Sequence, residues 1–475
     1  MVVLSSWIDG GPVAATEAEP AFKLIDPSSG ALIARLDEGG GAATDRAVVA
    51  AEAAFRANRR SSLHDRAGWL RAAAAALRAA SDDIAALICA DVGKPLKAAR
   101  FEAGRGGDFL DNCAAATLQL TGETIPVDAA PAGRGHFGFT RHVPYGVVAA
   151  ITPFNAPLNL LLQKVAPALA AGNAVIVKPA PSGTRTALRV VAEMEAAGVP
   201  KGLVGVLTGD RDTALALAAH PGVSAVSFTG GTVAGDALAR AASARKFTAE
   251  LGSNAANVVF ADADIATAAK KIAGAAFEAS GQQCISAQRV LVQRPVFDAF
   301  LAAFVATAQG MKTGDPLDIT TDLGPMVHRA AADRVMAMAA DAAAAGARVP
   351  LAPEQRDCFV TPGVFADVPR NARLWTEEVF GPLALVNPFD TLDEALELAN
   401  DSPFGLQGAV FTASLATAMR FSDDFEVGSL WVNEPSRFRL DMAPFGGVKR
   451  SGVGREGIRY AIEEMSQIRF TGIMI

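Results

Sequence analysis

From Gly146 onward, short apolar segments alternate regularly with longer segments of helical periodicity. The apolar segments are Val147–Ile151, Ala174–Val177, Leu203–Leu207, Ala225–Phe228 and Phe247–Leu251, and the helical ones are Leu158–Ala170, Thr184–Ala197, Asp212–Ala219 and Val233–Ala242. Strands that alternate with helices at such intervals form βαβ units and a parallel sheet. The sequence therefore predicts an α/β fold whose ligands bind beyond the carboxyl ends of the strands.

Polar and Gly-rich groups follow these predicted strands at the ends where a ligand would lie. They are Thr152–Pro157 after the first strand, Lys178 after the second, Thr229–Gly231 after the fourth and Glu250–Gly252 at the fifth. Glycines before a helix let backbone N–H groups approach an anion such as a pyrophosphate. The usual dinucleotide pattern G-x-G-x-x-G is absent from the first turn, where Pro153 and Pro157 stand, so a dinucleotide would be held in another way.

A single thiol, Cys284, follows a short bend that contains Gly281, Gln282 and Gln283. We expect a helix over Ala268–Ala279 and a strand over Gln288–Val292, which places the thiol in the connection between them. Free N–H groups in such a connection can lower the pKa of a thiol and hold an oxyanion. A buried, purely structural cysteine is the alternative, and from this stretch alone it is the commoner case.

Composition excludes several classes of protein. A chain of 475 residues is too long for one core, so two or more domains are expected. A net charge of −7 without a basic cluster argues against nucleic acid, and the absence of a run of about 18 apolar residues argues against a membrane span. The four cysteines are far apart, which predicts neither zinc nor disulfides and fits a reducing cytoplasm. The first ten residues lack a signal-peptide pattern, so we expect a soluble, unexported protein.

Helices and extended segments flank the regular region. Helical periodicity covers Ala42–Asn58, Leu63–Val92 and Lys97–Leu118, whereas Thr121–His142 alternates like extended strands and is predicted to form an arm. A second α/β region is expected up to about Gly447, with a capped helix that opens within Phe389–Asp390–Thr391–Leu392–Asp393–Glu394 and ends near Asn400. Residues Ile468–Ile475 are apolar and β-prone, an edge that another segment or subunit would normally cover.

Seven of these motifs, in this order, resemble the aldehyde dehydrogenase superfamily over about residues 140 to 457. They are the Asn155 loop, Lys178, the Gly230 turn, Glu250–Leu251–Gly252, Gly281–Gln282–Gln283–Cys284, Glu378–Val379–Phe380–Gly381–Pro382 and Pro444–Phe445–Gly446–Gly447. The resemblance implies a Rossmann-type cofactor domain (1–119 and 143–249), a second α/β catalytic domain (250–464) and a small β oligomerisation arm (120–142 and 465–475). It also implies a homodimer or homotetramer.

The resemblance further implies a role for each matching residue. Cys284 would be the nucleophile, Glu250 the general base, and Asn155 an oxyanion donor beside the Cys284 N–H. NAD or NADP would contact Ile151, Thr152, Phe154, Lys178, Gly209, Thr229, Gly230, Gly231, Leu251, Glu378 and Phe380, and no metal is expected. Many members carry a carboxylate three residues beyond the lysine. Here Pro181 stands there, so the choice between NAD and NADP stays open.

The reaction implied is oxidation of a small aldehyde to its acid through a cysteine thiohemiacetal, hydride transfer and thioester hydrolysis. The segments after Cys284 and around Arg437 and Arg439 are similar to the subgroup of lactaldehyde, phosphonoacetaldehyde and non-phosphorylating glyceraldehyde-3-phosphate dehydrogenases. Either arginine could hold an anionic tail, or both could be structural. Gln283 and Ala156 stand where phosphonate-handling relatives carry Arg and His, which favours a semialdehyde or hydroxyaldehyde.

Two other functions remain open at this point. A CoA-acylating dehydrogenase would pass the acyl group to CoA, but a thiol acceptor does not need the base that Glu250 provides. A non-catalytic binding or structural protein on the same scaffold would not require Cys284, Asn155 and Glu250 together. Each residue also has a structural alternative, since Asn155 and Glu378 can cap a helix or turn, and Lys178 and Glu250 can be solvated.

Overall fold

A computed structural model describes residues 2–13, 22–37 and 39–475 and contains two large sheets. The larger has eight strands in the order β24-β12-β11-β8-β9-β10-β2-β3. Its strands are β2 (Trp7–Ile8), β3 (Gly11–Pro12), β8 (Val147–Thr152), β9 (Ala174–Pro179), β10 (Val204–Val206), β11 (Ala225–Thr229), β12 (Lys246–Glu250) and β24 (Gly452–Val453). The five strands from β12 to β10 run parallel, which confirms the predicted α/β fold.

The chain order reverses between β8 and β11 in this sheet. From β8 the chain passes through α5 (Asn159–Ala171) to β9 and through α6 (Thr184–Ala196) to β10, and then through α7 (Arg211–Ala219) back to β11 on the other side of β8. Helix α8 (Thr232–Ala241) leads on to β12. At such a reversal the loops leave in opposite directions and open a crevice at the carboxyl ends of the strands. This reversal lies at the sheet edge where the sequence predicts a ligand.

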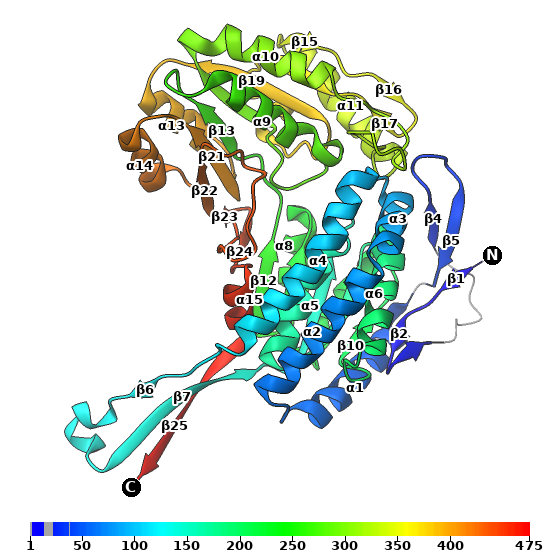
Figure 1. Ribbon diagram of the computed structural model, residues 1–475, viewed down its shortest axis with the longest axis vertical. Coiled ribbons are helices and arrows are strands. Elements are labelled where there is room, and N and C mark those ends of the chain that lie inside the picture. Colours follow the sequence, from blue (N-terminus) through cyan, green and yellow to red (C-terminus); the bar gives the residue numbers. More distant parts are fainter. Residues whose placement is uncertain (1, 14–21, 38) are drawn as a thin grey trace.

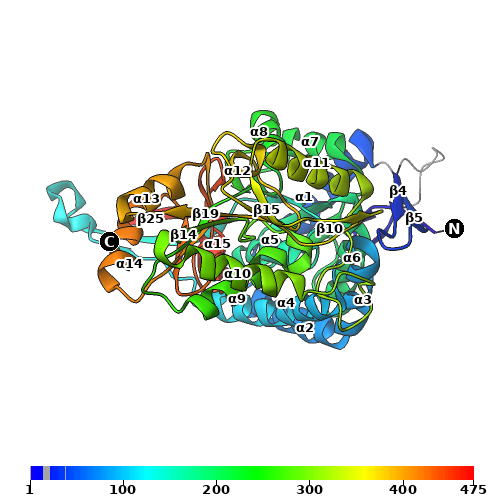
Figure 2. The same ribbon diagram turned by 90° about the horizontal axis from the view of Figure 1, so that it is seen from above.

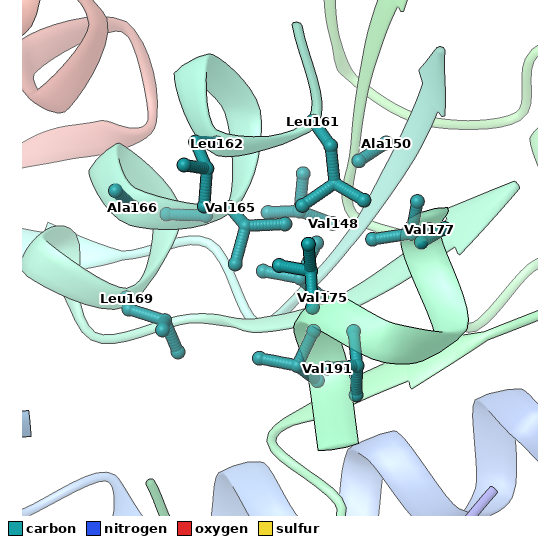
Figure 3. Close-up of a cluster of buried hydrophobic side chains, with 14 of the residues drawn as sticks. Val148, Ala150, Leu161, Leu162, Val165, Ala166, Leu169, Val175, Val177 and Val191 are labelled. Carbon is teal, nitrogen blue, oxygen red and sulfur yellow. The ribbon is translucent and has the colours of Figure 1, made fainter. Parts of the chain in front are cut away.

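Helix α5 is buried on every side. Leu161, Leu162 and Val165 pack on Val148 and Val175 of the sheet (Figure 3), and all residues of α5 are buried. Helices α2 (Leu63–Ala79) and α4 (Leu96–Thr117) cover its outer side, while α1 (Gly40–Asn58) packs with α7. Burial of each large aliphatic side chain stabilises the fold by about 1.5–3 kcal/mol. The loop before α5 is therefore attached to a rigid element.

The prediction of one helix over Leu63–Val92 is wrong. Helix α2 ends at Ala79, and α3 (Ser81–Val92) is a separate helix. The break falls at Ala80, where φ is −94° and ψ is 8°, and Asp82 and Asp83 follow in the first turn of α3. Carboxylates are favourable at a helix N-terminus because of the helix dipole, so the acidic pair stabilises a new start there.

The second large sheet has seven strands in the order β15-β18-β19-β14-β13-β21-β22. They are β13 (Ala256–Val259), β14 (Arg289–Gln293), β15 (Arg348–Leu351), β18 (Gly363–Ala366), β19 (Leu383–Phe389), β21 (Gln407–Phe411) and β22 (Ser429–Val432). Around it lie α9 (Ile265–Phe277), α10 (Phe297–Gln309), α11 (Arg329–Ala344), α12 (Arg373–Thr376), α13 (Leu392–Asn400) and α14 (Leu415–Asp424). Thr391 caps α13 by accepting the Glu394 N–H, as predicted.

A three-stranded arm projects from the rest of the chain (Figures 1 and 2). Strand β7 (His136–Pro144) pairs antiparallel with β25 (Ser466–Met474) from the C-terminus, and β6 (Thr124–Ile125) joins β7. The side chains of Ile468 and Met474 are 70% and 81% exposed. Within the described residues, no helix is both long enough and apolar enough to span a bilayer.

The remaining elements are short. They are β1 (Val3–Leu4), β4 (Phe22–Ile25), β5 (Leu32–Leu36), β16 (Gln355–Arg356), β17 (Phe359–Val360), β20 (Phe404–Gly405), β23 (Val448–Lys449) and α15 (Ile458–Glu464). Strands β4 and β5 pair antiparallel and are connected by a turn over Asp26–Gly30. Residues 1, 14–21 and 38, which belong to the predicted cofactor segment 1–119, lie outside the described residues. The predicted domain boundaries stay predictions.

Candidate active site

Cys284 lies in a tight turn between α9 and β14, at the amino end of β14. The predicted helix over Ala268–Ala279 ends earlier, at Phe277, because Ala279, Ser280 and Gly281 all have left-handed backbone (φ 51°, 58° and 67°). Non-glycine residues adopt this conformation at a cost of about 1–3 kcal/mol each, so the surrounding structure must hold the turn. The Ser280 hydroxyl donates to the Gly324 carbonyl at 2.7 Å and thereby pins it.

The Cys284 side chain is partly exposed and lines a small cavity of about 70 Å³. Asn155, Gln283, Arg437 and Arg439, all predicted for the site, line the same cavity. In the described part of the chain, neither the Asn155 amide nor the Cys284 N–H has a hydrogen-bond partner. Both donors are thus available to an oxygen atom bound next to the sulfur.

The Asn155 loop is anchored by a carboxylate from another helix. Glu102 on α4 is 3% exposed, and its Oε1 accepts the N–H groups of Leu158 at 2.9 Å and Asn159 at 3.1 Å. Its Oε2 pairs with the ammonium group of Lys94. Glu102 therefore satisfies free N–H groups in the first turn of α5, where a negative charge is also favoured by the helix dipole.

Glu250 ends β12 and faces a neighbouring cavity. It is 4% exposed and lies beside Glu456, Arg455 and Lys164, while Gln163 lines both this cavity and that of Cys284. The Glu250 Oε2 is buried without a hydrogen-bond partner in the described chain. A β-carbon at Gly446 would lie 2.9 Å from the Glu250 Oε1, so the Pro444–Gly447 loop closes on this carboxylate.

Burial dominates the electrostatics of both groups. It raises the pKa of the Cys284 thiol to about 12, and the negative charge of Glu378 adds to this shift. Burial also raises the pKa of Glu250 well above its ordinary value, with a further contribution from the charge of Glu456. The resting thiol is therefore protonated near neutral pH, and Glu250 can accept a proton more readily than an ordinary carboxylate.

The residues predicted to bind the cofactor lie along the carboxyl edge of the large sheet. Ile151 and Thr152 pair with Lys178 and Pro179 at the ends of β8 and β9. Thr229 ends β11 beside Glu250, and Gly230 donates its N–H to the Glu250 carbonyl at 3.1 Å. Gly209 (φ 129°) precedes the Asp210 cap of α7, and Leu251 follows β12.

Several features of this edge fit a dinucleotide. Gly231 caps α8 without a side-chain hydrogen bond, and a β-carbon there would meet open space, so a phosphate can approach the helix N-terminus. The Thr229 hydroxyl is buried and unpartnered within the described chain. Burial lowers the pKa of Lys178 to about 8 although Asp210 opposes the shift, and its ammonium group donates to the Pro179 carbonyl at 2.9 Å.

Glu378 and Phe380 reach this edge from the second sheet. Gln288 holds their segment by accepting the Val379 N–H at 2.9 Å and donating to the Glu377 carbonyl at 3.0 Å. The Phe380 and Phe154 rings pack edge to face with their centres 5.9 Å apart. This contact joins the two predicted cofactor segments. Burial raises the pKa of Glu378 to about 7, although its carboxylate accepts the Ser253 N–H at 2.9 Å.

The two predicted substrate arginines differ. Arg439 is engaged, because it donates to Glu456 at 3.0 Å and its guanidinium lies 3.7 Å from the centre of the Phe445 ring. Arg437 makes a single hydrogen bond, at 3.2 Å, to Glu278. Gln283 donates weakly to the Glu278 carbonyl at 3.4 Å. Arg437 is therefore the more available of the two.

The structure also places residues in the site that sequence reasoning missed. Lys94, Glu102 and Glu278 line the Cys284 cavity, and Lys164 and Glu456 lie behind Glu250, where Glu456 also accepts a hydrogen bond from the predicted Arg439. Glu278 lies six residues before Cys284 and could have been noted as an acidic residue in an apolar surrounding. The residues around Glu102 did not indicate that its carboxylate contacts Leu158, 56 residues further along the chain.

Comparison with known proteins identifies the family. The sequence model of the aldehyde dehydrogenase family matches residues 13–471. The chain is 39% identical to a 3-sulfolactaldehyde dehydrogenase of Priestia aryabhattai, over 86% of this chain and 85% of the relative. It is 36% identical to an aspartate-semialdehyde dehydrogenase of Pseudomonas canavaninivorans, over 94% and 96%.

A solved structure gives the same answer. The NADP-dependent glyceraldehyde-3-phosphate dehydrogenase of Bacillus halodurans, complexed with NADP, superposes with a TM-score of 0.97 at 31% identity and covers 100% of both chains. A family match over nearly the whole chain, relatives above 30% identity and this fold agree. The chain belongs to the aldehyde dehydrogenase family and is an aldehyde oxidoreductase that uses NAD or NADP.

Proposed function

We propose that the protein oxidises an aldehyde to its carboxylic acid, with Cys284 as the nucleophile. The observation that carries this proposal is the shared cavity, which both Cys284 and Asn155 line and where, among the described residues, the Asn155 amide and the Cys284 N–H have no hydrogen-bond partner. A thiol among free donors can attack a carbonyl carbon and stabilise the oxygen that becomes charged.

In the first step the Cys284 sulfur adds to the aldehyde carbon. The carbon–sulfur bond forms, the carbonyl electron pair moves to oxygen, and the Asn155 amide and the Cys284 N–H donate to that oxyanion. Because burial raises the pKa of the thiol to about 12, a base must take its proton, and Glu250, whose own pKa is raised by burial, would serve as that base. Loss of one oxyanion donor typically costs on the order of 3–4 kcal/mol.

The cofactor residues would hold NAD or NADP at the edge of the large sheet. Gly230, Gly231 and Thr229 would bind the pyrophosphate, Lys178 the adenosine ribose, and Glu378 with Phe380 the nicotinamide ribose and ring. A bound oxidised nicotinamide supplies the acceptor for the hydride of the adduct. The adduct then becomes a thioester on Cys284.

Hydrolysis of the thioester requires a deprotonated water. Glu250 would take the water proton, after rotation from its cavity toward Gln163 and Cys284 or through a water between them. The hydroxide adds to the thioester carbon. The carbon–sulfur bond then breaks, which releases the acid and restores the thiol. The buried pair of Lys164 and Glu456, 3.0 Å apart, would hold Glu250 in place from behind.

The charged lining next to the Cys284 cavity favours a substrate whose remote end is charged. A larger cavity of about 580 Å³ adjoins that of Cys284 and contains Lys97, Arg105, Lys271, Arg437 and Arg439. Names of the relatives point the same way, since one is named for a sulfonated aldehyde and another for an amino acid semialdehyde. A semialdehyde or hydroxyaldehyde with a charged end is therefore proposed.

A homodimer or homotetramer in the cytoplasm is part of the proposal. The exposed apolar side chains of β25, including Phe470 at 53%, would be covered by a second copy of the arm. Four free cysteines suit a reducing compartment. Light scattering of the wild type and of a double variant, Ile468→Asp with Phe470→Asp, would test the assembly. The double variant should have the mass of a monomer.

The test of function is a panel of aldehydes with NAD or NADP, followed by the absorbance of reduced nicotinamide. Oxidation by the wild type without CoA, lost in Cys284→Ala, is expected, and the acid should appear in equal amount. A requirement for CoA would indicate the acylating reaction instead. If Cys284→Ala binds reduced cofactor normally and no aldehyde is oxidised by the wild type, the proposal fails and a binding protein remains.

A further inference from the structure

An acidic and a basic side chain lie together between the two cavities of the site. Glu278 and Arg437 line both the 70 Å³ cavity of Cys284 and the adjoining 580 Å³ cavity. A molecule that extends from the sulfur into the larger cavity must pass this pair. We call the two residues the charge pair.

The charge pair is only half satisfied. A single hydrogen bond of 3.2 Å joins Arg437 Nη2 to Glu278 Oε1. The Arg437 Nε is buried without a partner, and the Glu278 Oε2 and Arg437 Nη1 make no hydrogen bond in the described chain. The Glu278 and Arg437 side chains are 40% and 22% exposed, so both are partly open to solvent, although the Arg437 Nε itself is buried. Each residue keeps a free end for a ligand.

Three of the other four cations of the larger cavity are already neutralised. Arg105 pairs with Asp441, Lys271 with Glu434 and Arg439 with Glu456. Only Lys97, which is exposed, has no acidic partner in the described chain. The cavity therefore offers a ligand both a positive and a negative end rather than a net positive charge.

The two charges select the kind of ligand that fits between them. A purely anionic tail on Arg437 would stand beside the Glu278 carboxylate and be repelled by it, and a purely cationic tail would be repelled by Arg437. A head group with one charge of each sign replaces both halves of the existing ion pair and leaves no buried charge unmatched. Such a head group also gives a hydrogen-bond partner to the free donor of Arg437 and to the free acceptor of Glu278.

We propose that the remote end of the substrate is an amino acid head group, whose carboxylate binds Arg437 and whose ammonium group binds Glu278. This inference rests on the proposed function, because it places the aldehyde of the same molecule at Cys284. It goes further by assigning Glu278 as a specificity-determining residue.

Ligand binding without turnover tests the inference separately from the reaction. The probes are the amino acids aspartate, glutamate and 2-aminoadipate, and the matched acids without the amino group, succinate, glutarate and adipate. Binding is measured by titration calorimetry on the full-length Cys284→Ala variant. At least one amino acid should bind about tenfold more tightly than its matched acid, since a charge-assisted hydrogen bond is gained.

Three further variants in the same background identify the residues responsible. Glu278→Gln should remove the preference for the amino group. Arg437→Gln should weaken the binding of the amino acids and of the plain acids alike. Glu434→Gln is the matched control, because it removes a carboxylate that pairs with Lys271 but does not line either cavity. The Glu434→Gln variant should prefer the amino acid over its matched acid to the same extent as the Cys284→Ala parent.

Equal binding of all three matched pairs, failure of all six compounds to bind, or a preference that survives Glu278→Gln would overturn the inference. These outcomes are independent of the proposed function, which is judged by oxidation of simple aldehydes by the wild type. If propanal and hexanal are oxidised but the amino group has no effect on binding, only the head-group inference fails.

Discussion

Glu102 and Asn159 connect two helices at the candidate active site: the carboxylate of Glu102 on α4 accepts the N–H of Asn159 on α5 at 3.1 Å. The same oxygen accepts the Leu158 N–H, and the second oxygen pairs with Lys94. Asn155 lies directly before this helix turn and lines the Cys284 cavity. The carboxylate thus fixes the start of α5 and, through it, the loop that carries the predicted oxyanion donor.

Replacement of Glu102 by glutamine should lower both stability and kcat. The amide oxygen can still accept both N–H groups, although without a negative charge, but the NH₂ group would face the Lys94 ammonium, which is 9% exposed and would be left buried and unpaired. Breaking a buried ion pair in this way costs about 3–5 kcal/mol. Chemical denaturation measures the loss, and steady-state kinetics should show kcat reduced with little change in the binding of reduced cofactor.

A second replacement separates positioning from simple damage. Lys94→Met with Glu102→Gln removes the unpaired charge, so stability should recover in part through coupling of neighbouring sites. The kcat should stay low, because the anionic acceptor for the α5 N–H groups is still missing. Full recovery of kcat in the double variant would contradict a positioning role for Glu102.

Gly281→Ala should destabilise the protein and abolish oxidation. Gly281 has a φ of 67°, and a β-carbon there would collide with the carbonyl oxygen of Gly381. The collision would displace either the Cys284 turn or the segment that carries Phe380. We expect a loss of more than about 1 kcal/mol, the usual cost of a strained backbone position. Thermal unfolding and the aldehyde assay measure the two effects.

Gly68→Ala is the matched control for that substitution. Gly68 lies on the exposed side of α2, and a β-carbon there meets nothing within 4 Å. Alanine favours helix over glycine by about 0.5–1 kcal/mol, so this variant should be slightly more stable and fully active. Equal destabilisation by both substitutions would mean that the Gly281 conformation has no special importance.

The parallel sheet was predictable because its signal is local and repeated. Val147–Ile151 and Ala174–Val177 are continuous apolar runs bounded by polar turns, as expected of strands buried on both faces, and β8 and β9 are fully buried. The break between α2 and α3 at Ala80 was not predictable from periodicity, because Ala79 and Ala80 both carry a strong helical preference.

The candidate site was predictable only where a motif marked it. Cys284, Asn155 and Arg437 line one cavity as the motif order implied, but the position of Glu250 behind Gln163 depends on side-chain packing. Glu102 and Glu278 were missed because their importance arises from contacts over long sequence distances, to Asn159 and Arg437. A single glutamate in a helical segment is by default a solvated residue.

Removal of the Glu378 charge should make Cys284 more reactive. Burial is the main reason that the thiol pKa is raised to about 12, and Glu378 is the largest charged contributor. Without that negative charge the thiolate is less disfavoured, so the pKa should fall in Glu378→Gln. The rate of alkylation by iodoacetamide, followed at Cys284 by mass spectrometry, should rise at lower pH than in the wild type.

Asp393→Asn serves as the control for the alkylation experiment, since this exposed carboxylate lies on α13 and, among the described residues, pairs with Arg420 alone, at 3.7 Å. Its alkylation profile should coincide with that of the wild type. A Glu378→Gln profile that is unchanged or shifted to higher pH would mean that Glu378 does not act on the thiol.

Asp91→Asn should stabilise the protein at alkaline pH. Asp91 is 1% exposed, both of its carboxylate oxygens lack a hydrogen bond in the described chain, and Arg185 lies 3.2 Å away without donating one. Burial raises the pKa of Asp91 from 3.8 to about 7. Between these two values the folded chain holds a proton that the unfolded chain releases. The free energy of unfolding therefore falls as the pH rises, by up to about 1.4 kcal/mol per pH unit from this group.

An asparagine cannot ionise, so the variant should lose this part of the pH dependence. Thermal unfolding at pH 5 and pH 8 measures the difference, and the gain over wild type should be larger at pH 8, where the Asp91 carboxylate is charged in both states. The ion pair with Arg185, whose side chain is 23% exposed, opposes this gain. If the variant melts below the wild type at pH 8, attraction to Arg185 outweighs the cost of burying the charge, and the raised pKa of Asp91 is wrong.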